Sequence, residues 1–554
     1  MSLTAGLPGQ LPGQMMDQPL LVSALLAHAE RYHADTEIVS RTIEDGSLHR
    51  YTYADAARRA RRLAKALARL GVRPGERVAT LAWNGYRHFE LYYAISGSGA
   101  VLHTVNPRLF PEQIAWIIND AEDGVVFFDL TFAPLIEKLA PQCPAVRHWV
   151  AMSDRAHRPS AAIPRLGCYE DLLAAEDDDY AWPQFDERAA SALCYTSGTT
   201  GNPKGVLYSH RSVLLHCYAS CLPDVFGFSA RDCILPVVPM FHVNAWTIPY
   251  SAPMVGAKLV LPGAALDGPS LCELFEAEGV TFTGGVPTVW QGILQHLQKT
   301  GGKPTTLKRG VMGGSAAPPA LMETFARDYG VQIDHAWGMT ELSPLGVYNR
   351  EKRKHGGLDD EARRALAAKQ GRPPFGVEMK IVDAQGRTLP NDGEAVGELL
   401  VRGHWVVGQY FNVGAPTLRD GWFPTGDVGS IDADGYLWIT DRAKDVIKSG
   451  GEWIGSIELE NLACAHPAVA QAAVIGVAHP KWDERPLLVI VPKTGQRPSR
   501  EELLAWYEGK IAKWWTPDDV VFVEQLPLTA TGKISKLQLR EQFRDHRLPG
   551  AAGG

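Results

Sequence analysis

The chain has 554 residues, of which 45% are hydrophobic and 21% are charged, so it has the length of about three or four folding units and is not disordered overall. Its 55 Lys and Arg residues and 62 Asp and Glu residues give a net charge of −7, whereas nucleic-acid binding needs clustered positive charge. This composition excludes a single small module and disfavours a nucleic-acid partner.

The first 15 residues contain two Leu-Pro-Gly-Gln copies and predict a flexible leader that needs no function. The first basic residue is Arg31, so this segment lacks the charged start of a signal peptide. The sequence has eight cysteines, no CxxC pair, no His/Cys cluster at zinc spacing and no apolar run of 18 residues. We therefore expect a cytoplasmic protein without a disulfide framework, a structural metal site or a membrane span.

Strand-like apolar runs alternate with amphipathic helical windows along the chain. The runs include residues 77–81, 124–128, 258–261 and 380–382, and the windows include residues 54–70 and 270–277. This alternation predicts an α/β fold with largely parallel sheets. The basic stretch within residues 58–69 lies at helical spacing, and we interpret it as a solvated helix face; a patch for nucleic acid or acidic lipid is the alternative.

A loop between two apolar strands, residues 196–205, is the strongest local signal. Glycines let the backbone approach an anion closely, while hydroxyls, N–H groups and an ammonium bind phosphate oxygens. The spacing is not that of a Walker A loop and a strand follows, so a P-loop NTPase is disfavoured. A phosphate-binding loop is therefore predicted, with a plain surface turn as the alternative. Its residues are Thr196, Ser197, Gly198, Thr199, Thr200, Gly201 and Lys204.

The character of the sequence changes near residue 440, where a strand-like run is followed by a compact charged segment. We predict an N-terminal domain of residues 1–440, a linker of residues 441–445 and a C-terminal domain of residues 446–554. A small loop near the C-terminus, residues 529–533, carries one lysine, Lys533.

Together with this loop, a series of ordered motifs makes the chain resemble the adenylate-forming family, which includes acyl-CoA synthetases, firefly luciferases and peptide synthetase adenylation domains. The motifs are residues 196–205, 313–317, 337–341, 421–427, 441–445, 448–452 and 531–533. The resemblance spans nearly the whole chain. It implies a large N-terminal domain of β-sheets flanked by helices and a small mobile α+β C-terminal domain, and it is closest to bacterial medium- or long-chain fatty acid–CoA ligases.

The resemblance implies that ATP activates a carboxylic acid as an acyl-adenylate, with loss of pyrophosphate, and that coenzyme A then accepts the acyl group. Because two anions meet in the first step, the site has to neutralise charge and align the reactants. By resemblance, the loop from Thr196 to Lys204 grips the β- and γ-phosphates. Glu341 and Thr196 would hold Mg²⁺, with Thr340 beside the phosphate.

The resemblance also implies how the nucleoside is held. Asp427 would accept both ribose hydroxyls, and Arg442 would support the same sugar. The family usually has Tyr where Trp337 stands, so any contact made by the phenolic hydroxyl is lost. The residues implied around the adenine are Gly314, Ser315, Ala316, Trp337, Gly338 and Met339.

In the C-terminal domain, Lys533 matches the family's catalytic lysine, which bridges the carboxylate and the α-phosphate; an ordinary surface lysine is the alternative. For the second step, the small domain would rotate about Lys444 to admit the thiol, unless this segment is only a connector. The entry path of the thiol would be lined by Lys448, Gly450, Gly451 and Glu452.

The apolar segment of residues 238–246 forms the acyl pocket by resemblance, although such a segment is also typical of core packing. Val243 and Trp246 would line it, with Trp246 as a gate, and His242 lies near the pocket or is a core histidine. Gly338 stands where acetate activators have an indole, so its missing side chain would leave the pocket deep. Gly455 replaces a serine of the fatty-acyl relatives. A medium- or long-chain fatty acid is the predicted substrate.

Several alternatives stay open. The substrate could be a short, aromatic or sulfur-containing acid instead. The acyl group could also be transferred to a carrier protein rather than to CoA. A nucleotide-binding scaffold without turnover is disfavoured by the intact lysine, glutamate and aspartate. We expect a small carboxylic acid as the partner and do not expect a nucleic acid. A peripheral membrane contact and a homodimer are further possibilities.

Overall fold

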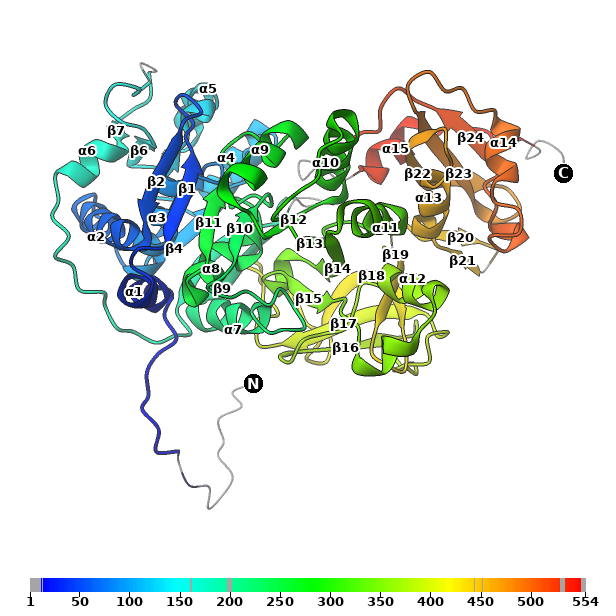
Figure 1. Cartoon of the computed structure of the whole chain (residues 1–554), viewed down its shortest axis with the longest axis horizontal. Helices are drawn as coiled ribbons and strands as arrows, with labels where there is room; N and C mark the ends of the chain where they lie inside the picture. Colours follow the sequence, from blue (N-terminus) through cyan, green and yellow to red (C-terminus); the bar gives the residue numbers. More distant parts are fainter. Residues whose placement is uncertain are drawn as a thin grey trace.

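The computed structural model describes residues 11, 13–159, 162–196, 202–442, 444–450, 452–528 and 534–549, with the backbone alone for Glu452 and Trp453. The described residues form four sheets, three of them N-terminal to residue 443. Figure 1 shows the C-terminal part, in orange and red, at one end of the molecule's long axis.

The first sheet has the strand order β7-β6-β5-β3-β4-β8-β9, and its neighbouring strands are parallel except for β8 and β9. Its strands are β3 (Arg77–Leu81), β4 (Val101–Thr104), β5 (Val125–Phe128), β6 (His148–Ala151), β7 (Leu166–Cys168), β8 (Ala190–Tyr195) and β9 (Gly205–Ser209). Helices in the same part of the chain are α2 (Tyr53–Arg69), α3 (Tyr86–Gly97), α4 (Pro111–Asp120), α5 (Ala133–Leu139), α6 (Tyr169–Ala174) and α7 (His210–Ser220).

The second sheet has the order β15-β14-β13-β12-β10-β11-β1-β2, parallel except at its two edges. Its strands are β1 (Glu37–Arg41), β2 (Leu48–Thr52), β10 (Cys233–Pro236), β11 (Lys258–Leu261), β12 (Phe282–Gly285), β13 (Arg309–Met312), β14 (Gln332–Gly338) and β15 (Leu345–Tyr348). Helices associated with this part of the fold are α1 (Val22–Tyr32), α8 (Ile248–Val255), α9 (Gly268–Glu278), α10 (Pro287–Thr300), α11 (Pro319–Thr324) and α12 (Asp360–Ala368).

The two large sheets share one core and each has a second core on its other face. Along β5, Val125 and Phe127 point into the shared core, while Val126 and Phe128 point into the outer core. Helices α1, α2, α3, α7 and α8 contribute to the shared core, α4 and α5 to one outer core, and α9, α10 and α11 to the other. Strands buried on both faces appear as continuous apolar runs, which is why the sequence revealed them.

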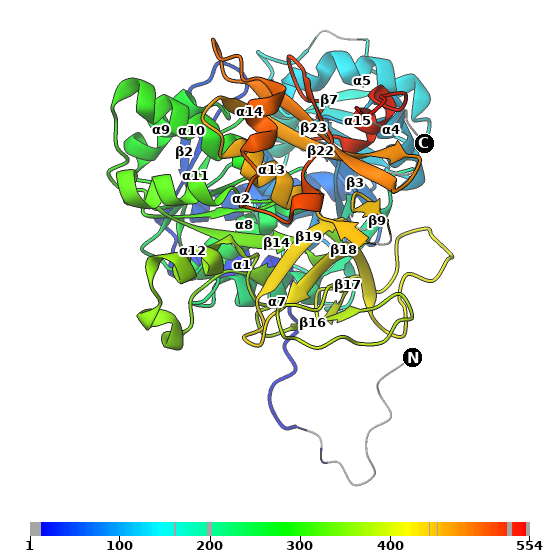
Figure 2. The same cartoon turned by 90° about the vertical axis from the view of Figure 1, so that its right-hand side faces the viewer.

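The third sheet is antiparallel, in the order β16-β17-β18-β19, and it leads to the C-terminal part. Its strands are β16 (Val377–Val382), β17 (Gly397–Gly403), β18 (Phe423–Ile431) and β19 (Leu437–Arg442). The C-terminal sheet contains β20 (Ile447–Ser449), β21 (Glu452–Ile454), β22 (Val469–His479), β23 (Asp483–Pro492) and β24 (Asp519–Phe522). Its helices are α13 (Ser456–Cys464), α14 (Arg500–Ala505) and α15 (Lys536–Gln542), and Figure 2 shows this part end-on, above β18 and β19.

The predicted α/β fold, with a large sheet-containing N-terminal domain and a smaller C-terminal domain, is confirmed. The predicted runs coincide with β3, β5, β11 and the end of β16, and the two helical windows with α2 and α9. β19 ends at Arg442 and β20 begins at Ile447, but the proposed domain limits at residues 440 and 446 stay predictions.

The basic stretch of α2 is only partly the solvated face that we expected: the side chains of Arg58 and Arg69 are 46% and 47% exposed, but others are covered and paired with acidic groups. Arg59 binds Glu90 at 2.7 Å and Glu170 at 2.9 Å, and Arg61 binds Glu30 at 2.7 Å. The side chains of Arg59 and Arg61 are only 25% and 17% exposed. Acidic groups of neighbouring segments neutralise these cations, so a nucleic-acid or acidic-lipid patch gains no support either.

None of the described helices combines the length and the apolar character that crossing a membrane requires. All eight cysteines are unpaired.

Candidate active site

The predicted phosphate loop is closed at its base by the β8–β9 hairpin. The N–H of Thr196 donates to the carbonyl of Lys204 at 2.9 Å, and the N–H of Lys204 donates to the Thr196 hydroxyl at 3.3 Å. The N–H of Phe411 donates to the carbonyl of Gly205 at 2.8 Å, which joins the hairpin to the segment around residue 410. Ser197, Gly198, Thr199, Thr200 and Gly201 lie outside the described residues.

Lys204 and Glu341 are linked through Tyr410. The Lys204 ammonium lies 5.0 Å from the centre of the Tyr410 ring, and the Tyr410 hydroxyl donates to Oε1 of Glu341 at 2.7 Å. Glu341 is 7% exposed; burial raises the pKa of its carboxyl, while the Tyr410 hydrogen bond and the charges of Arg442 and Lys204 oppose that rise. Sequence reasoning missed Tyr410, because its only local sign is an aromatic residue in a polar segment.

The Thr340–Glu341 backbone is fixed by two other elements. The Tyr208 hydroxyl on β9 donates to the carbonyl of Thr340 at 2.7 Å, and the N–H of Val407 donates to the carbonyl of Glu341 at 2.8 Å. The described residues contain no group of three or more His, Cys, Asp and Glu side chains that could hold a metal ion. A single buried carboxylate fits Mg²⁺ if the nucleotide and water supply most of its oxygen ligands.

Trp337, Asp427 and Arg442 form a second group, on β14, β18 and β19. The indole N–H of Trp337 donates to Oδ2 of Asp427 at 2.9 Å, and Nε of Arg442 lies 2.8 Å from Oδ1 of the same carboxylate. Asp427 is 2% exposed, so these charge-assisted contacts offset the cost of its burial. The family's phenolic hydroxyl is missing here, but the indole supplies a donor of its own.

We expect Trp337→Phe to raise the KM for ATP by about tenfold, because one hydrogen bond to a charged group is lost. The phenyl ring keeps an aromatic face, so kcat and the KM for the acid should change little. Steady-state kinetics with varied ATP, together with a thermal unfolding curve, check this. An unchanged KM for ATP in a folded variant would remove Trp337 from the nucleotide site.

The loop of residues 313–316 follows β13, which is paired with β14 at the level of Met312 and His335. It therefore lies near the end of the strand that carries Trp337. Gly314 has a φ of +84°, which favours glycine, and Ser315 is exposed. Met339 directly precedes the short 3₁₀ helix Thr340–Leu342.

The segment predicted to form the acyl pocket contains a left-handed turn. Five consecutive non-glycine residues, Val243–Thr247, have φ values between 46° and 61°. Such residues cost about 1–2 kcal/mol each, so tertiary contacts must hold the turn. Val243 is 3% and Trp246 9% exposed, and the Trp246 ring lies over Gly284 and Gly313, where a Cβ would be 3.4 and 3.3 Å from ring atoms. His242 is partly exposed and directly precedes the turn.

His216 connects this turn to β15. The N–H of Leu345 donates to Nε2 of His216 at 3.1 Å, so Nε2 carries no proton, and Nδ1 lies 2.8 Å from the Thr247 hydroxyl. Burial lowers the pKa of His216 to about 3. Its stabilising effect is therefore complete above the pKa of the unfolded state, near 6.5, and is lost as the pH falls toward about 3.

We expect the free energy of unfolding of the wild type to fall relative to His216→Gln as the pH decreases. Glutamine has an acceptor and a donor but does not titrate, so the difference between the two proteins should change by about 2 kcal/mol from pH 7.5 to pH 5. Urea unfolding at both pH values checks this, and other titrating groups cancel in the comparison. A difference independent of pH would show that His216 is not buried in its neutral form.

Gly338 does not leave the pocket open as we expected. A Cβ at Gly338 would lie 2.0 Å from the carbonyl oxygen of Pro344, so backbone occupies the space next to this residue. A side chain at residue 338 would need a shift of the backbone between β14 and β15. The depth argument based on Gly338 is therefore wrong, and Trp246 is the residue that fills space near the strand ends.

The predicted hinge and thiol-path residues lie on the surface of the C-terminal part. Lys444, Lys448 and Gly450 are exposed. The N–H of Lys448 donates to Glu484 at 3.0 Å and that of Gly450 to the carbonyl of Trp482 at 2.8 Å. Gly451, the side chain of Glu452 and Lys533 lie outside the described residues.

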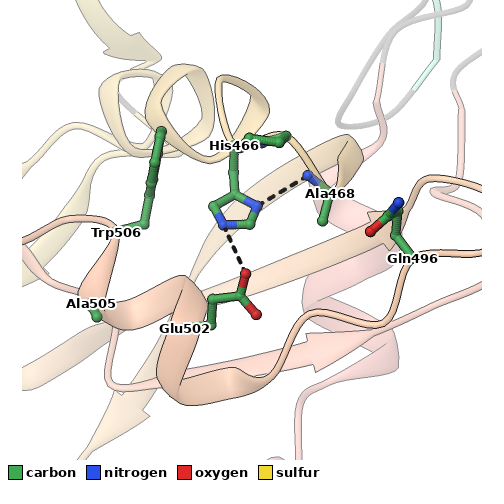
Figure 3. Close-up of a pocket in the computed structure, with 7 residues that line it drawn as sticks. His466, Ala468, Gln496, Glu502, Ala505 and Trp506 are labelled. Atoms are coloured by element: carbon green, nitrogen blue, oxygen red, sulfur yellow. Dashed lines mark hydrogen bonds and ion pairs between the residues drawn. The ribbon is translucent and has the colours of Figure 1, made fainter.

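A cavity of about 520 Å³ lies in the C-terminal part, and none of the predicted site residues lines it. Figure 3 shows His466 at its centre, between Glu502 and Ala468. His466 accepts from the N–H of Ala468 at 3.2 Å and lies 3.5 Å from Glu502 and edge-on to Trp506. These contacts join the turn after α13 to α14, which is a structural role.

The chain matches two protein families. It is also similar to proteins of known activity over nearly its whole length. Residues 25–411 match the family described as AMP-binding enzyme, and residues 458–533 match the AMP-binding enzyme C-terminal domain. A 3-methylmercaptopropionyl-CoA ligase of Ruegeria lacuscaerulensis is 56% identical, covering 96% of this chain and 99% of that protein. A medium-chain-fatty-acid–CoA ligase of Ectopseudomonas oleovorans is 52% identical, covering 96% and 98%.

Among solved structures, the anthranilate CoA ligase AuaEII in complex with anthranoyl-AMP is similar, with a TM-score of 0.84 and 27% sequence identity. The match covers 95% of this chain and 98% of that one.

Proposed function

The chain belongs to the family of AMP-binding enzymes and is an acyl-CoA ligase of the AMP-forming type; we propose that its acid substrate is of medium length. ATP and CoA are its co-substrates. The observation that supports a nucleotide site is the arrangement of two groups on adjoining segments, Lys204–Tyr410–Glu341 and Trp337–Asp427–Arg442. The first suits a triphosphate and the second suits a ribose.

We propose the following division of roles at the phosphates. The loop from Thr196 to Lys204 binds the β- and γ-phosphates, with the Lys204 charge held in place by the Tyr410 ring. Glu341 and the Thr196 hydroxyl would hold Mg²⁺. When bound, the ion supplies positive charge to the phosphate oxygens as pyrophosphate departs.

The nucleoside would be held by the second group. The Asp427 carboxylate would accept from the ribose hydroxyls, a role that an anion fills with charge-assisted hydrogen bonds. Lys533 would stabilise the charge between the carboxylate and the α-phosphate, and rotation about Lys444 would then admit the thiol of CoA along Lys448 and Gly450.

The length of the acid is argued from Trp246. Its ring lies over Gly284 and Gly313 and fills the space at the ends of β12 and β13. An acid that extends beyond this ring would have to displace it, which supports a medium rather than a long chain. Pentanoate and 3-methylmercaptopropionate have chains of the same length, because the thioether sulfur takes the place of one methylene. We expect both to be short enough not to displace the Trp246 ring.

A thioether acid is a specific second candidate. The relative at 56% identity is a 3-methylmercaptopropionyl-CoA ligase, and sulfur at the edge of an aromatic ring is favoured by about 0.3–1.5 kcal/mol. Trp246 would supply that ring. A homodimer, a peripheral membrane contact and a cytoplasmic location stay predictions.

A panel of acids tests the proposal. Acetate, pentanoate, 3-methylmercaptopropionate, octanoate and palmitate are each supplied with ATP, Mg²⁺ and CoA, and AMP release is measured. We expect kcat/KM to rise by about fourfold per methylene from acetate and to fall again before palmitate. Highest activity with acetate or palmitate would contradict the medium length, and a ratio of thioether acid to pentanoate above about threefold would favour the thioether acid.

We expect Trp246→Ala to move the preference of the enzyme toward longer acids. Removal of the indole opens the space over Gly284 and Gly313, so the ratio of kcat/KM for palmitate to that for pentanoate should rise by at least about tenfold. The same acid panel measures this ratio. An unchanged ratio in a folded variant would place the end of the acyl chain elsewhere.

A further inference from the structure

A buried lysine near the C-terminus belongs to a charged network at the junction of the two domains. The ammonium of Lys536, the first residue of α15, donates to the hydroxyl of Ser456 and lies 2.8 Å from Oε1 of Glu460. The Ser456 N–H and hydroxyl both donate to Oδ2 of Asp441, at 2.7 and 2.6 Å. Ser456 is fully buried, Asp441 is 1% exposed and the Lys536 side chain is 13% exposed.

The members of this network come from opposite sides of the proposed hinge. Asp441 lies on β19, which is paired with β18 in the third sheet, so it belongs to the N-terminal part. Ser456 and Glu460 lie on α13, and Lys536 lies on α15, both after residue 445. Lys444 lies between Asp441 and Ser456 in the chain. A rotation about Lys444 therefore changes the distance between the Asp441 carboxylate and the Ser456 group that it binds.

The network also completes the N-terminus of α13. Gly455, which precedes that helix, has no side chain to cap it, and Asp441 accepts from the first helical N–H instead. Burial by itself lowers the pKa of Lys536, but the charges of Glu460 and Asp441 raise it above the ordinary lysine value, so the amine stays charged. A charged amine in this place is held by its partners, and it loses part of that support when the domains separate.

A second contact strengthens the same junction. Arg540, one turn further along α15, binds Asp445 at 2.7 Å, directly after the proposed hinge residue. Asp441 is followed in the chain by Arg442, which binds the proposed ribose carboxylate Asp427. α15 is therefore connected through Ser456 and Asp441 to the strand that forms part of the nucleotide site.

We propose that Lys536 is a positioning residue that, with Ser456 and Asp441, holds the C-terminal domain in the orientation used for adenylate formation. The proposal rests on the proposed two-step function. Lys536 touches no substrate; it acts through the orientation of the domain. The CoA step would use the rotated orientation, so we expect it not to depend on this network.

The test separates the two half-reactions in Lys536→Met, which keeps the length of the side chain and removes its charge. Acid-dependent exchange of labelled pyrophosphate into ATP reports adenylate formation, and CoA ester formation from supplied acyl-adenylate reports the second step. We expect the exchange to fall by about 30-fold while the second step stays within about threefold of the wild type. Lys536→Arg should restore at least about a third of the exchange, because its guanidinium keeps the charge.

Lys513→Met is the matched control, because Lys513 is an exposed lysine of the same domain, and it should leave both steps unchanged. Asp441→Asn provides a test from the other side of Lys444. It should lower the exchange in the same selective way, and the double variant with Lys536→Met should be no slower than the slower single variant, because both changes break one network.

The outcomes distinguish this inference from the proposed function. If none of the acids in the panel supports exchange of labelled pyrophosphate into ATP by the wild type, the proposed function fails. If the wild type exchanges it and Lys536→Met lowers both half-reactions equally, or neither, the positioning role is refuted. If Lys536→Met does not fold, as judged by its thermal unfolding curve, Asp441→Asn decides the question by the same two measurements.

Discussion

We expect replacement of Lys533 by alanine to lower the rate of adenylate formation by about a hundred- to a thousandfold, while transfer of supplied acyl-adenylate to CoA should change by less than about threefold. The reason is electrostatic. Negative charge builds up where the acid attacks the α-phosphate, and an ammonium at that point stabilises the transition state more than the ground state. In the second step the thiol attacks the acyl carbon rather than phosphorus, and AMP leaves, so we expect this step not to need Lys533.

Pyrophosphate exchange and CoA ester formation from acyl-adenylate measure the two steps of Lys533→Ala separately. Lys513→Ala, a change of an exposed lysine in the same domain, is the control and should match the wild type. Equal loss of both steps would mean that Lys533 supports the domain as a whole, and full activity in both would make it an ordinary surface lysine.

Glu341→Gln should lower adenylate formation by about a hundredfold at a fixed concentration of Mg²⁺ without destabilising the fold. The amide keeps an oxygen that accepts from the Tyr410 hydroxyl, so the change removes the charge and little else. Because burial raises the pKa of Glu341, the charged form is costly in the folded protein, and a neutral replacement should unfold at an equal or higher temperature.

The dependence on Mg²⁺ separates a metal ligand from a residue that only packs. We expect Glu341→Gln to need a higher Mg²⁺ concentration for half-maximal exchange. Tyr410→Phe keeps the carboxylate and should show the wild-type Mg²⁺ dependence with a smaller loss of rate. If Glu341→Gln has the wild-type Mg²⁺ dependence, another group holds the ion.

These results bear on the inference about Lys536 as well. Lys533→Ala and Lys536→Met should affect the same half-reaction, but for different reasons: one removes charge from the reacting atoms, and the other loosens the orientation of the domain. Lys536→Arg should restore part of the activity, since a longer cation still reaches Ser456 and Glu460, whereas we expect Lys533→Arg not to restore adenylate formation.

Sequence reasoning correctly predicted the α/β fold and the strands on either side of the loop of residues 196–205. It was only partly right about the basic face of α2 and wrong about the space beside Gly338. In both places the outcome depended on residues distant in the sequence: acidic groups such as Glu170 neutralise α2, and the carbonyl of Pro344 fills the space beside Gly338. Periodicity and composition do not report such neighbours.

The sequence by itself determined the family and predicted a phosphate-binding loop, because glycines, hydroxyls and a lysine at close spacing carry that information within a few residues. Only the tertiary structure decided that the Trp337 indole binds Asp427, that Tyr410 joins Lys204 to Glu341, and that Lys536 reaches Ser456. The members of these groups are 69 to 90 residues apart where a hydrogen bond joins them. Packing of separate strands and helices brings them together, and no local pattern in the chain encodes which partner each side chain will meet.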